Sequence, residues 1–226
     1  METKCENYQM QKIPLKIKVT IETPQEMDDA EQSNIFLPDG KSWIDIRPKI
    51  PQRIQMDTET FERIWNMHPQ EQRKGKMFGK EISYPRWEQT YGHDYKYAGH
   101  NHLALPVADQ YLKLVLEWVR TDSGLSYQGL LINWYEDGNH YIGWHADNES
   151  IIVPNSPIYS FSFGQERIFA IKSKSGQYNK EILMRNGSLI IMGGEMQKYY
   201  KHSVPKISKN QCPGKRINLT FRLFHK

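Results

Sequence analysis

The second half of the chain alternates short hydrophobic runs with turn-forming residues, a pattern that is typical of a protein built mainly from β-strands. Turn signals lie between the runs, as in Asp137-Gly138 and Asn186-Gly187. Many short strands joined by tight turns predict a β-barrel or jelly roll. The predicted strands cover residues 127–135, 141–147, 157–163, 167–173, 181–184, 188–192 and 216–224.

Two earlier segments show the spacing of amphipathic helices. Residues 58–66 are predicted as a short helix, because Thr58 can cap its start and its hydrophobic residues share one face. A second helix is predicted over about 107–122, where hydrophobic residues recur at helical spacing and Gly124 follows as a C-cap. The fold class that follows is mainly β with flanking helices (α+β).

The N-terminal part of the chain is more polar than the rest. Residues 15–21 alternate hydrophobic with charged or polar side chains, which predicts a strand, and the polar residues 24–34 predict a loop or flexible connector. We therefore expect three parts: an N-terminal strand and connector over 1–34, a middle region over 35–102, and a β-rich core over 103–226.

Composition limits the class of protein without identifying it. Hydrophobic residues make up 38% and charged residues 25% of the chain, and the mean hydropathy is −0.73, which fits a globular protein and excludes a disordered one. The net charge is +4, a mild basic bias that permits an anionic partner without requiring one. The aromatic share of 12% would suit stacking on bases.

Cysteine usage and the lack of long apolar runs indicate the compartment. Cys5 and Cys212 lie far apart and form no CxxC pair, so a reducing compartment is expected. The N-terminus has no signal-peptide core, and no stretch approaches the roughly 18 apolar residues of a membrane span. We expect a soluble intracellular monomer without membrane contact, in the nucleus or the cytoplasm.

The last predicted strand alternates polar and hydrophobic residues, so that its polar residues share one face. The simplest interpretation is a half-exposed strand with this face in water. The alternative is a barrel that directs the polar residues inward, to a polar lumen that forms a site. The polar face holds Arg216, Asn218, Thr220 and Arg222, and the same two-residue spacing pairs Asn133 with Tyr135 and His145 with Asp147.

The His145-Ala146-Asp147 segment could hold a metal ion from one face of a strand. One imidazole, one carboxylate and a further histidine form the facial triad of non-haem iron(II) oxygenases. The pair alone is a weak signal, because the eight His and 26 acidic residues of the chain give about one His-x-Asp/Glu by chance. His202 is the candidate third ligand, since it lies far enough along the chain for a barrel to bring it round.

An ordered set of motifs over about 90 residues resembles the AlkB family of Fe(II)- and 2-oxoglutarate-dependent dioxygenases. The motifs are Asn133-Trp134-Tyr135, Asp137-Gly138, Ile142-Gly143-Trp144-His145-Ala146-Asp147, Glu149, Ser162-Phe163-Gly164, Arg167-Ile168-Phe169, Asn186-Gly187-Ser188-Leu189, His202-Ser203-Val204-Pro205 and the strand from Arg216 to Arg222. Upstream, Phe78-Gly79-Lys80, Pro85-Arg86 and Thr90-Tyr91-Gly92 resemble the nucleotide-recognition region of members that act on DNA. The resemblance covers most of residues 75–226.

The resemblance implies a double-stranded β-helix (jelly roll) core with an N-terminal nucleotide-recognition extension. It implies that iron is bound by His145, Asp147 and His202, and that the co-substrates are 2-oxoglutarate and O2. The residues implied to bind 2-oxoglutarate are Asn133, Tyr135, Arg216, Asn218 and Arg222. An arginine fork suits a carboxylate, although both arginines could instead form surface ion pairs.

The implied activity is oxidative demethylation of N-alkylated bases such as N1-methyladenine and N3-methylcytosine in DNA, with RNA as an alternative. The family's reaction converts 2-oxoglutarate to succinate and CO2 and releases formaldehyde. Two other hypotheses stay open: a dioxygenase that acts on RNA or protein, and an inactive relative that only binds nucleic acid.

Several residues are candidates for contact with the nucleic acid. Met77 and Phe78 lie between basic residues and could form a wedge that unstacks a duplex, or they could be buried in the core. An extracted base needs a stacking surface. Tyr91, Tyr95 and Tyr97 could provide it, or could pack against neighbouring strands.

Three further positions bear on the substrate pocket. Arg86 could organise the pocket, contact phosphate or lie on the surface. Many relatives carry a second acid directly after the ligand Asp, whereas this chain has Asn148 there and Glu149 next, which leaves the preferred cationic base open. Trp144 could belong to the pocket or to the core.

Overall fold

The computed structural model describes residues 33–77, 80–97, 100–207 and 214–225. Its largest element is a seven-stranded sheet in which neighbouring strands run antiparallel. In spatial order its strands are β1 (Ser33–Phe36), β2 (Ser42–Arg47), β13 (Ser188–Gly194), β10 (Ile158–Gly164), β15 (Arg216–Arg222), β8 (Gly129–Tyr135) and β5 (Trp87–Tyr91).

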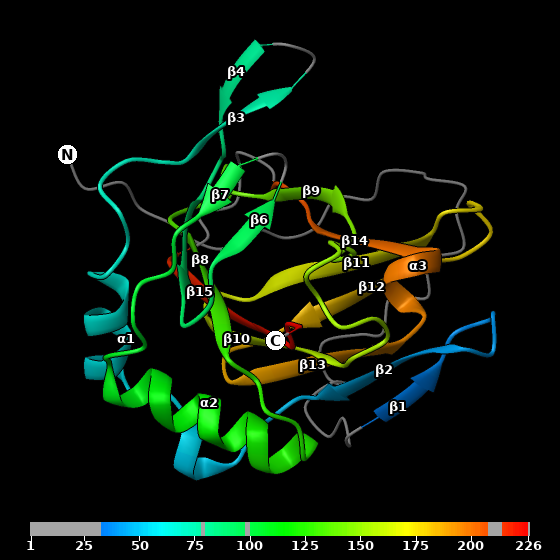
Figure 1. Cartoon of the computed structure of the whole chain (residues 1–226), viewed down its shortest axis with the longest axis horizontal. Coiled ribbons are helices and arrows are strands. Elements are labelled where there is room, and N and C mark those ends of the chain that lie inside the picture. The colour runs from blue at the N-terminus through cyan, green and yellow to red at the C-terminus, as the bar shows by residue number, and fades with distance from the viewer. Residues whose placement is uncertain (1–32, 78–79, 98–99, 208–213, 226) are drawn as a thin grey trace, which may run out of the picture.

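A four-stranded sheet packs against the inner face of this main sheet. Hydrophobic residues from both sheets form one cluster, in which Ile44 and Ile190 of the main sheet join Phe169 and Ile182 of the smaller one. Figure 1 shows the two sheets as the opposed walls of a jelly roll. The smaller sheet has the order β12 (Asn179–Met184), β11 (Arg167–Ser173), β14 (Tyr200–Val204), β9 (Ile142–His145).

Helices cover the outer face of the main sheet (Figure 1). The hydrophobic face of β15, with Ile217, Leu219 and Phe221, packs in the same cluster as Val115 and Val119 of the long helix. The main sheet is therefore buried on both faces, which explains why every residue of β8 and β15 is buried. The helical elements are η1 (Gln52–Ile54), α1 (Thr58–Trp65), α2 (Gln110–Ser123) and α3 (Met196–Tyr199).

Two hairpins lie outside the two large sheets. In Figure 1, the hairpin of β3 (Lys74–Met77) and β4 (Lys80–Ser83) projects away from the barrel, with β6 (Tyr95–Tyr97) and β7 (His100–His102) below it. Strand β5, the last strand at one edge of the main sheet, lies between the two hairpins along the chain. The hairpins thus extend from the same edge of the main sheet.

The predicted fold class is confirmed, and each of the seven strands predicted in the second half is present. Both helices are present as well. The prediction of Thr58 as the cap of α1 is wrong, because the side chain of Asp57 accepts the N–H of Thr60 at 2.8 Å. Helix α2 begins later than predicted, at Gln110, and ends as expected at Gly124, whose φ is 68°.

Several strands lie where no strand was predicted, among them β1, β2, β5 and β14. The predicted connector over 24–34 is wrong at its end, because residues 33–34 already belong to β1. The strand predicted over 15–21 lies outside the described residues. Strands β2 and β5 come from the middle region predicted over 35–102, yet they pair with strands of the β-rich core. The division of the chain into a middle region and a core stays a prediction.

None of the helices in the described part of the chain combines the length and the apolar character needed to cross a membrane.

Gly92 gives a test of the backbone that follows β5. Its φ is +82°, and a Cβ atom there would lie 2.3 Å from the backbone carbonyl oxygen of Gln128. Gly92→Ala should lower the free energy of unfolding by at least about 2 kcal/mol, since a left-handed conformation and a steric clash both oppose the methyl group. Gly124→Ala is the matched control, because Gly124 has a φ of +68° but nothing within 4 Å of the added Cβ. Equal losses of stability in denaturant titrations would contradict the role given to the clash.

Candidate active site

The polar face of β15 points into the lumen between the two sheets. Arg216, Asn218, Thr220 and Arg222 are all buried, so the interpretation of a water-facing strand is wrong. Residues that pair across antiparallel strands share a face. The lumen therefore also receives the partners of these residues: Tyr135 opposite Arg216, Asn133 and Ser162 opposite Asn218, and Ser160 opposite Thr220.

The smaller sheet brings together the three residues expected to bind iron. His145 on β9 pairs directly with His202 on β14, and their ring centroids are 4.2 Å apart. Asp147 follows β9 after one residue, and its carboxylate points back toward the histidines. One potential ligand atom from each of the three residues lies within 4.8 Å of the other two. Two imidazoles and a carboxylate at this spacing fit a facial iron site.

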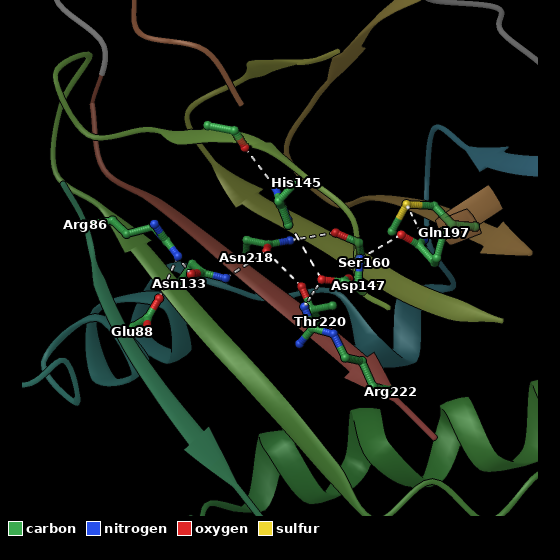
Figure 2. Close-up of polar contacts among 12 residues, drawn as sticks. Arg86, Glu88, Asn133, His145, Asp147, Ser160, Gln197, Asn218, Thr220 and Arg222 are labelled. Carbon is green, nitrogen blue, oxygen red and sulfur yellow. Dashed lines mark hydrogen bonds and ion pairs between the residues drawn. The ribbon is translucent and has the colours of Figure 1, made fainter. Parts of the chain in front are cut away.

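Neighbouring groups fix the orientation of these side chains. Nδ1 of His145 lies 2.9 Å from the carbonyl oxygen of Gly143. A carbonyl can only accept, so Nδ1 carries the proton and Nε2 keeps its lone pair for a metal. The backbone N–H of Asp147 donates to Oε1 of Gln197 at 2.9 Å, and Oδ1 of Asp147 accepts from Nη2 of Arg222 at 2.9 Å (Figure 2).

Two buried atoms of this cluster lack hydrogen-bond partners among the described residues: Oδ2 of Asp147 and Nδ1 of His202. Burial lowers the pKa of His145, and burial together with His145 lowers the pKa of His202 to about 3. Burial would raise the pKa of Asp147, but Arg222, His202 and His145 together outweigh burial, and the pKa of Asp147 falls below its usual value. At neutral pH the cluster therefore offers two neutral imidazoles and a carboxylate, the forms that bind metal.

Arg216 lies at the other end of the lumen as a buried cation. It is 2% exposed, which excludes a surface ion pair. Its Nη2 donates to Oγ of Ser162 at 2.9 Å, and its guanidinium carbon lies 4.8 Å from the ring centroid of Tyr135. Its Nε and Nη1 meet no acceptor within the described ranges. A buried guanidinium with unused donors fits the distal carboxylate of an anionic ligand.

Arg222 occupies a different place from Arg216. It is buried, and its ion pair with Asp147 puts it beside the metal cluster. A surface ion pair is excluded for this arginine too. The two arginines that look alike in the sequence thus have different surroundings: Arg222 is paired with Asp147, whereas Arg216 is bonded to Ser162 and lies against Tyr135.

Three expectations about substrate contacts need correction. Arg86 is not on the surface: it is buried and donates to Asn133 and Glu88. Tyr91 cannot stack on a base, because alternation along β5 turns it into the hydrophobic cluster under the helices, where burial raises its pKa to about 12. Trp144 is not a core residue, since it is 41% exposed, and its place in the pocket stays a prediction.

The other predicted contacts are less fully described. Met77 ends β3, and Tyr95 and Tyr97 bound β6, but the placement of their side chains is outside the described part of the structure, as is the whole of Phe78. Glu149 is partly exposed, two residues after Asp147. Their contacts with nucleic acid stay predictions.

Sequence reasoning missed several residues that shape the site. Arg167 is buried and donates to the backbone carbonyls of Asp137, His140 and Pro205, which ties together the loops around β9 and β14. Its place in the Arg167-Ile168-Phe169 motif was the available signal, but that motif gave no role for its side chain. Glu88 and Gln197 gave no signal in the sequence, since their roles depend on contacts between distant segments.

Comparison with known proteins agrees with this site. Residues 51–222 match the model of the 2OG-Fe(II) oxygenase superfamily. The chain is 28% identical over 241 residues to the DNA oxidative demethylase ALKBH2 of Arabidopsis thaliana, covering 91% of this chain and 73% of that protein. It is 33% identical over 162 residues to the DNA oxidative demethylase ALKBH2 of Homo sapiens, covering 65% of this chain and 59% of that protein.

A third relative and one solved structure extend the comparison. The alpha-ketoglutarate-dependent dioxygenase alkB homolog 3 of Bos taurus is 30% identical over 195 residues, covering 82% of this chain and 67% of that protein. The structure of OsALKBH1 superimposes with a TM-score of 0.56 at 15% identity, covering 84% of this chain and all of that one, and supports the fold alone. The chain is a dioxygenase of the AlkB family of 2OG-Fe(II) oxygenases, and its cofactors are iron(II), 2-oxoglutarate and O2.

Proposed function

We propose that this protein repairs N-alkylated bases in DNA by oxidative demethylation, with N1-methyladenine and N3-methylcytosine as substrates and RNA as a second substrate class. The observation that carries the proposal is one lumen that holds both the His145–Asp147–His202 cluster and the buried Arg216. Relatives named DNA oxidative demethylases support DNA as the substrate. A single chain supplies all of these residues, so a monomer suffices.

The iron centre would be held by His145, Asp147 and His202. When bound with 2-oxoglutarate and O2, iron supplies the oxidation that hydroxylates the N-methyl group, which then leaves as formaldehyde while succinate and CO2 form. The protein's own residues prepare this site. Gln197 holds the backbone of Asp147, and Arg222 keeps that carboxylate ionised.

The co-substrate would lie along the polar rows of the main sheet. Arg216, with Tyr135 against its guanidinium, would bind the distal carboxylate. Arg222 lies beside the metal cluster through its bond to Asp147. The two asparagines of the expected set, Asn133 and Asn218, are bonded to each other on neighbouring strands. The buried walls of the lumen exclude water, which strengthens each of these charge interactions.

The nucleic acid would approach from the side of the two hairpins. The hairpin of β3 and β4 carries Lys74 and Lys76 and projects from the barrel (Figure 1). A projecting element with lysines suits contact with the phosphates of a nucleic acid. Met77 and Phe78 at its end would open the duplex. Tyr95, Tyr97 and Glu149 would contact the extracted base.

The first prediction is that demethylation depends on the His145–Asp147–His202 cluster. Wild-type protein with Fe(II) and 2-oxoglutarate should remove the methyl groups of N1-methyladenine and N3-methylcytosine in oligonucleotides, as measured by mass spectrometry. His202→Ala should bind no metal and show no turnover, because two ligands leave the ion poorly held. Its melting curve is the control for folding. Wild-type turnover by His202→Ala would remove this residue from the proposed iron site.

The second prediction concerns Arg216. Arg216→Ala should weaken binding of an inert 2-oxoglutarate analogue by about 2–5 kcal/mol, the usual cost of losing one partner of a buried charge pair. Titration calorimetry measures the affinity. Arg216 is a cleaner probe than Arg222, whose removal would also leave Asp147 without its ion pair. Unchanged affinity would move the distal-carboxylate site away from β15.

The third prediction concerns Met77 and Phe78. Replacing both by Ala should slow repair of double-stranded substrate and spare single strands, because extracting a paired base costs a few kcal/mol that an inserted side chain partly offsets. The measurement is the ratio of duplex to single-strand rates. An equal fall on both substrates with a lowered melting temperature would show instead that both residues are buried, since truncating a core side chain costs about 2–5 kcal/mol.

A further inference from the structure

Strand β5 and the residue before it bring a buried ion pair into the lumen, and neither the proposed iron site nor the distal-carboxylate site uses this pair. Nη2 of Arg86 donates to Oε2 of Glu88 at 2.6 Å, and both residues are buried. Glu88 also lies 3.5 Å from Nη1 of Arg73, which is more exposed. Figure 2 shows Arg86 and Glu88 at one end of a row of polar side chains that runs through Asn133 toward Asp147.

Arg86 decides which way the amide of Asn133 faces. Its Nε donates to Oδ1 of Asn133 at 2.8 Å. A guanidinium can only donate, so the oxygen of the amide must face Arg86 and Nδ2 must face away from it, into the lumen. The orientation of this amide is therefore set by a charged group, not by a group that could either donate or accept.

Asn218 is held in a fixed orientation from the opposite side. Its Nδ2 donates to the backbone carbonyl of Phe161 at 2.7 Å and to Oγ of Ser160 at 2.9 Å. Its Oδ1 accepts from Oγ1 of Thr220 at 3.0 Å and from Nδ2 of Asn133 at 3.4 Å. An amide has two N–H donors and room for two bonds at its oxygen, so the hydrogen-bonding capacity of Asn218 is used within the protein.

Asn133 differs from Asn218 in what it has left to donate. Among the described residues, its Nδ2 has one partner, the long contact to Asn218, which leaves a second hydrogen uncommitted. Of the two asparagines expected to bind 2-oxoglutarate, Asn133 thus has a donor to offer. Asn218 holds the amide of Asn133 in place by accepting its other hydrogen.

We propose that Arg86 and Glu88 are positioning residues for the co-substrate: they fix the amide of Asn133 so that Nδ2 donates to 2-oxoglutarate, and Asn218 braces that amide without contacting the ligand. This role rests on the proposed function. Glu88 has a second effect, since its charge offsets that of Arg86. Among the described residues Arg216 has no carboxylate partner, so its unused donors stay available for the distal carboxylate.

A double-mutant cycle tests this role through binding rather than activity. Arg86→Lys keeps the charge but loses the fork that reaches two acceptors. With Mn(II) in place of iron, its affinity for N-oxalylglycine, an inert 2-oxoglutarate analogue, should fall about 10- to 100-fold, as for residues that orient a binding side chain. In an Asn133→Ala background the same change should have no further effect, because Arg86 then has no amide to orient.

Arg47→Lys is the matched control. Arg47 also pairs with two acceptors, Asp45 and Asp122, each at 2.9 Å, but it lies on the other face of the main sheet. Its substitution should leave the analogue's affinity unchanged. If Arg86→Lys does not give a folded protein by its melting curve, Glu88→Gln takes its place in the cycle, with the same expected loss and the same dependence on Asn133.

Two results would overturn the positioning role. Additive effects in the double mutant would show that Arg86 acts independently of Asn133. Unchanged analogue affinity, with weaker oligonucleotide binding and a smaller salt dependence, would show that Arg86 contacts phosphate. Failure of the wild-type protein to bind the analogue at all would overturn the proposed function itself, and this outcome is visible before any variant is made.

Discussion

The structure depends on one constraint: the main sheet is buried on both faces, yet its inner face carries charged and amide side chains. In such surroundings each polar group needs a partner or costs several kcal/mol. The Asp147–Arg222 ion pair meets this need at one end of the lumen, and the Arg86–Glu88 pair meets it beside Asn133. Arg216 is left with unused donors, and a site for an anion follows from that imbalance.

The sequence predicted the parts of the molecule whose signals are local. Alternation along β15 separated Ile217 from Arg216 and Asn218 correctly, because the period of a strand does not depend on its neighbours. Whether the polar side of β15 faces water or a lumen depends on distant segments of the chain. The simpler interpretation, a half-exposed strand, was wrong. His202 was a candidate from its distance along the chain, and the family resemblance supported it. The strand that carries it was not predicted, and β14 pairs with β9 across a long stretch of chain.

The residues that sequence reasoning misplaced share a physical cause. Tyr91 lies in a motif that resembles the nucleotide-recognition region. Side chains alternate along β5, so Tyr91 faces the helices, whereas Glu88 on the same strand faces the lumen. The side of the strand on which each residue lies could not be assigned, because β5 itself was not predicted. Glu88 and Gln197 matter through contacts with distant segments, and single-residue chemistry does not reveal such contacts.

The proposed metal ligands belong to the smaller sheet and to the segment directly after β9, while the proposed co-substrate residues belong to the main sheet. The distance between the two groups is therefore set by the hydrophobic layer that separates the sheets, in which Phe169 and Ile190 take part. This layer acts as a spacer. Side chains that touch no reactant thus share in determining the reach of the oxidising centre, and natural variation in their size is a route by which relatives with identical ligands could differ in catalytic rate.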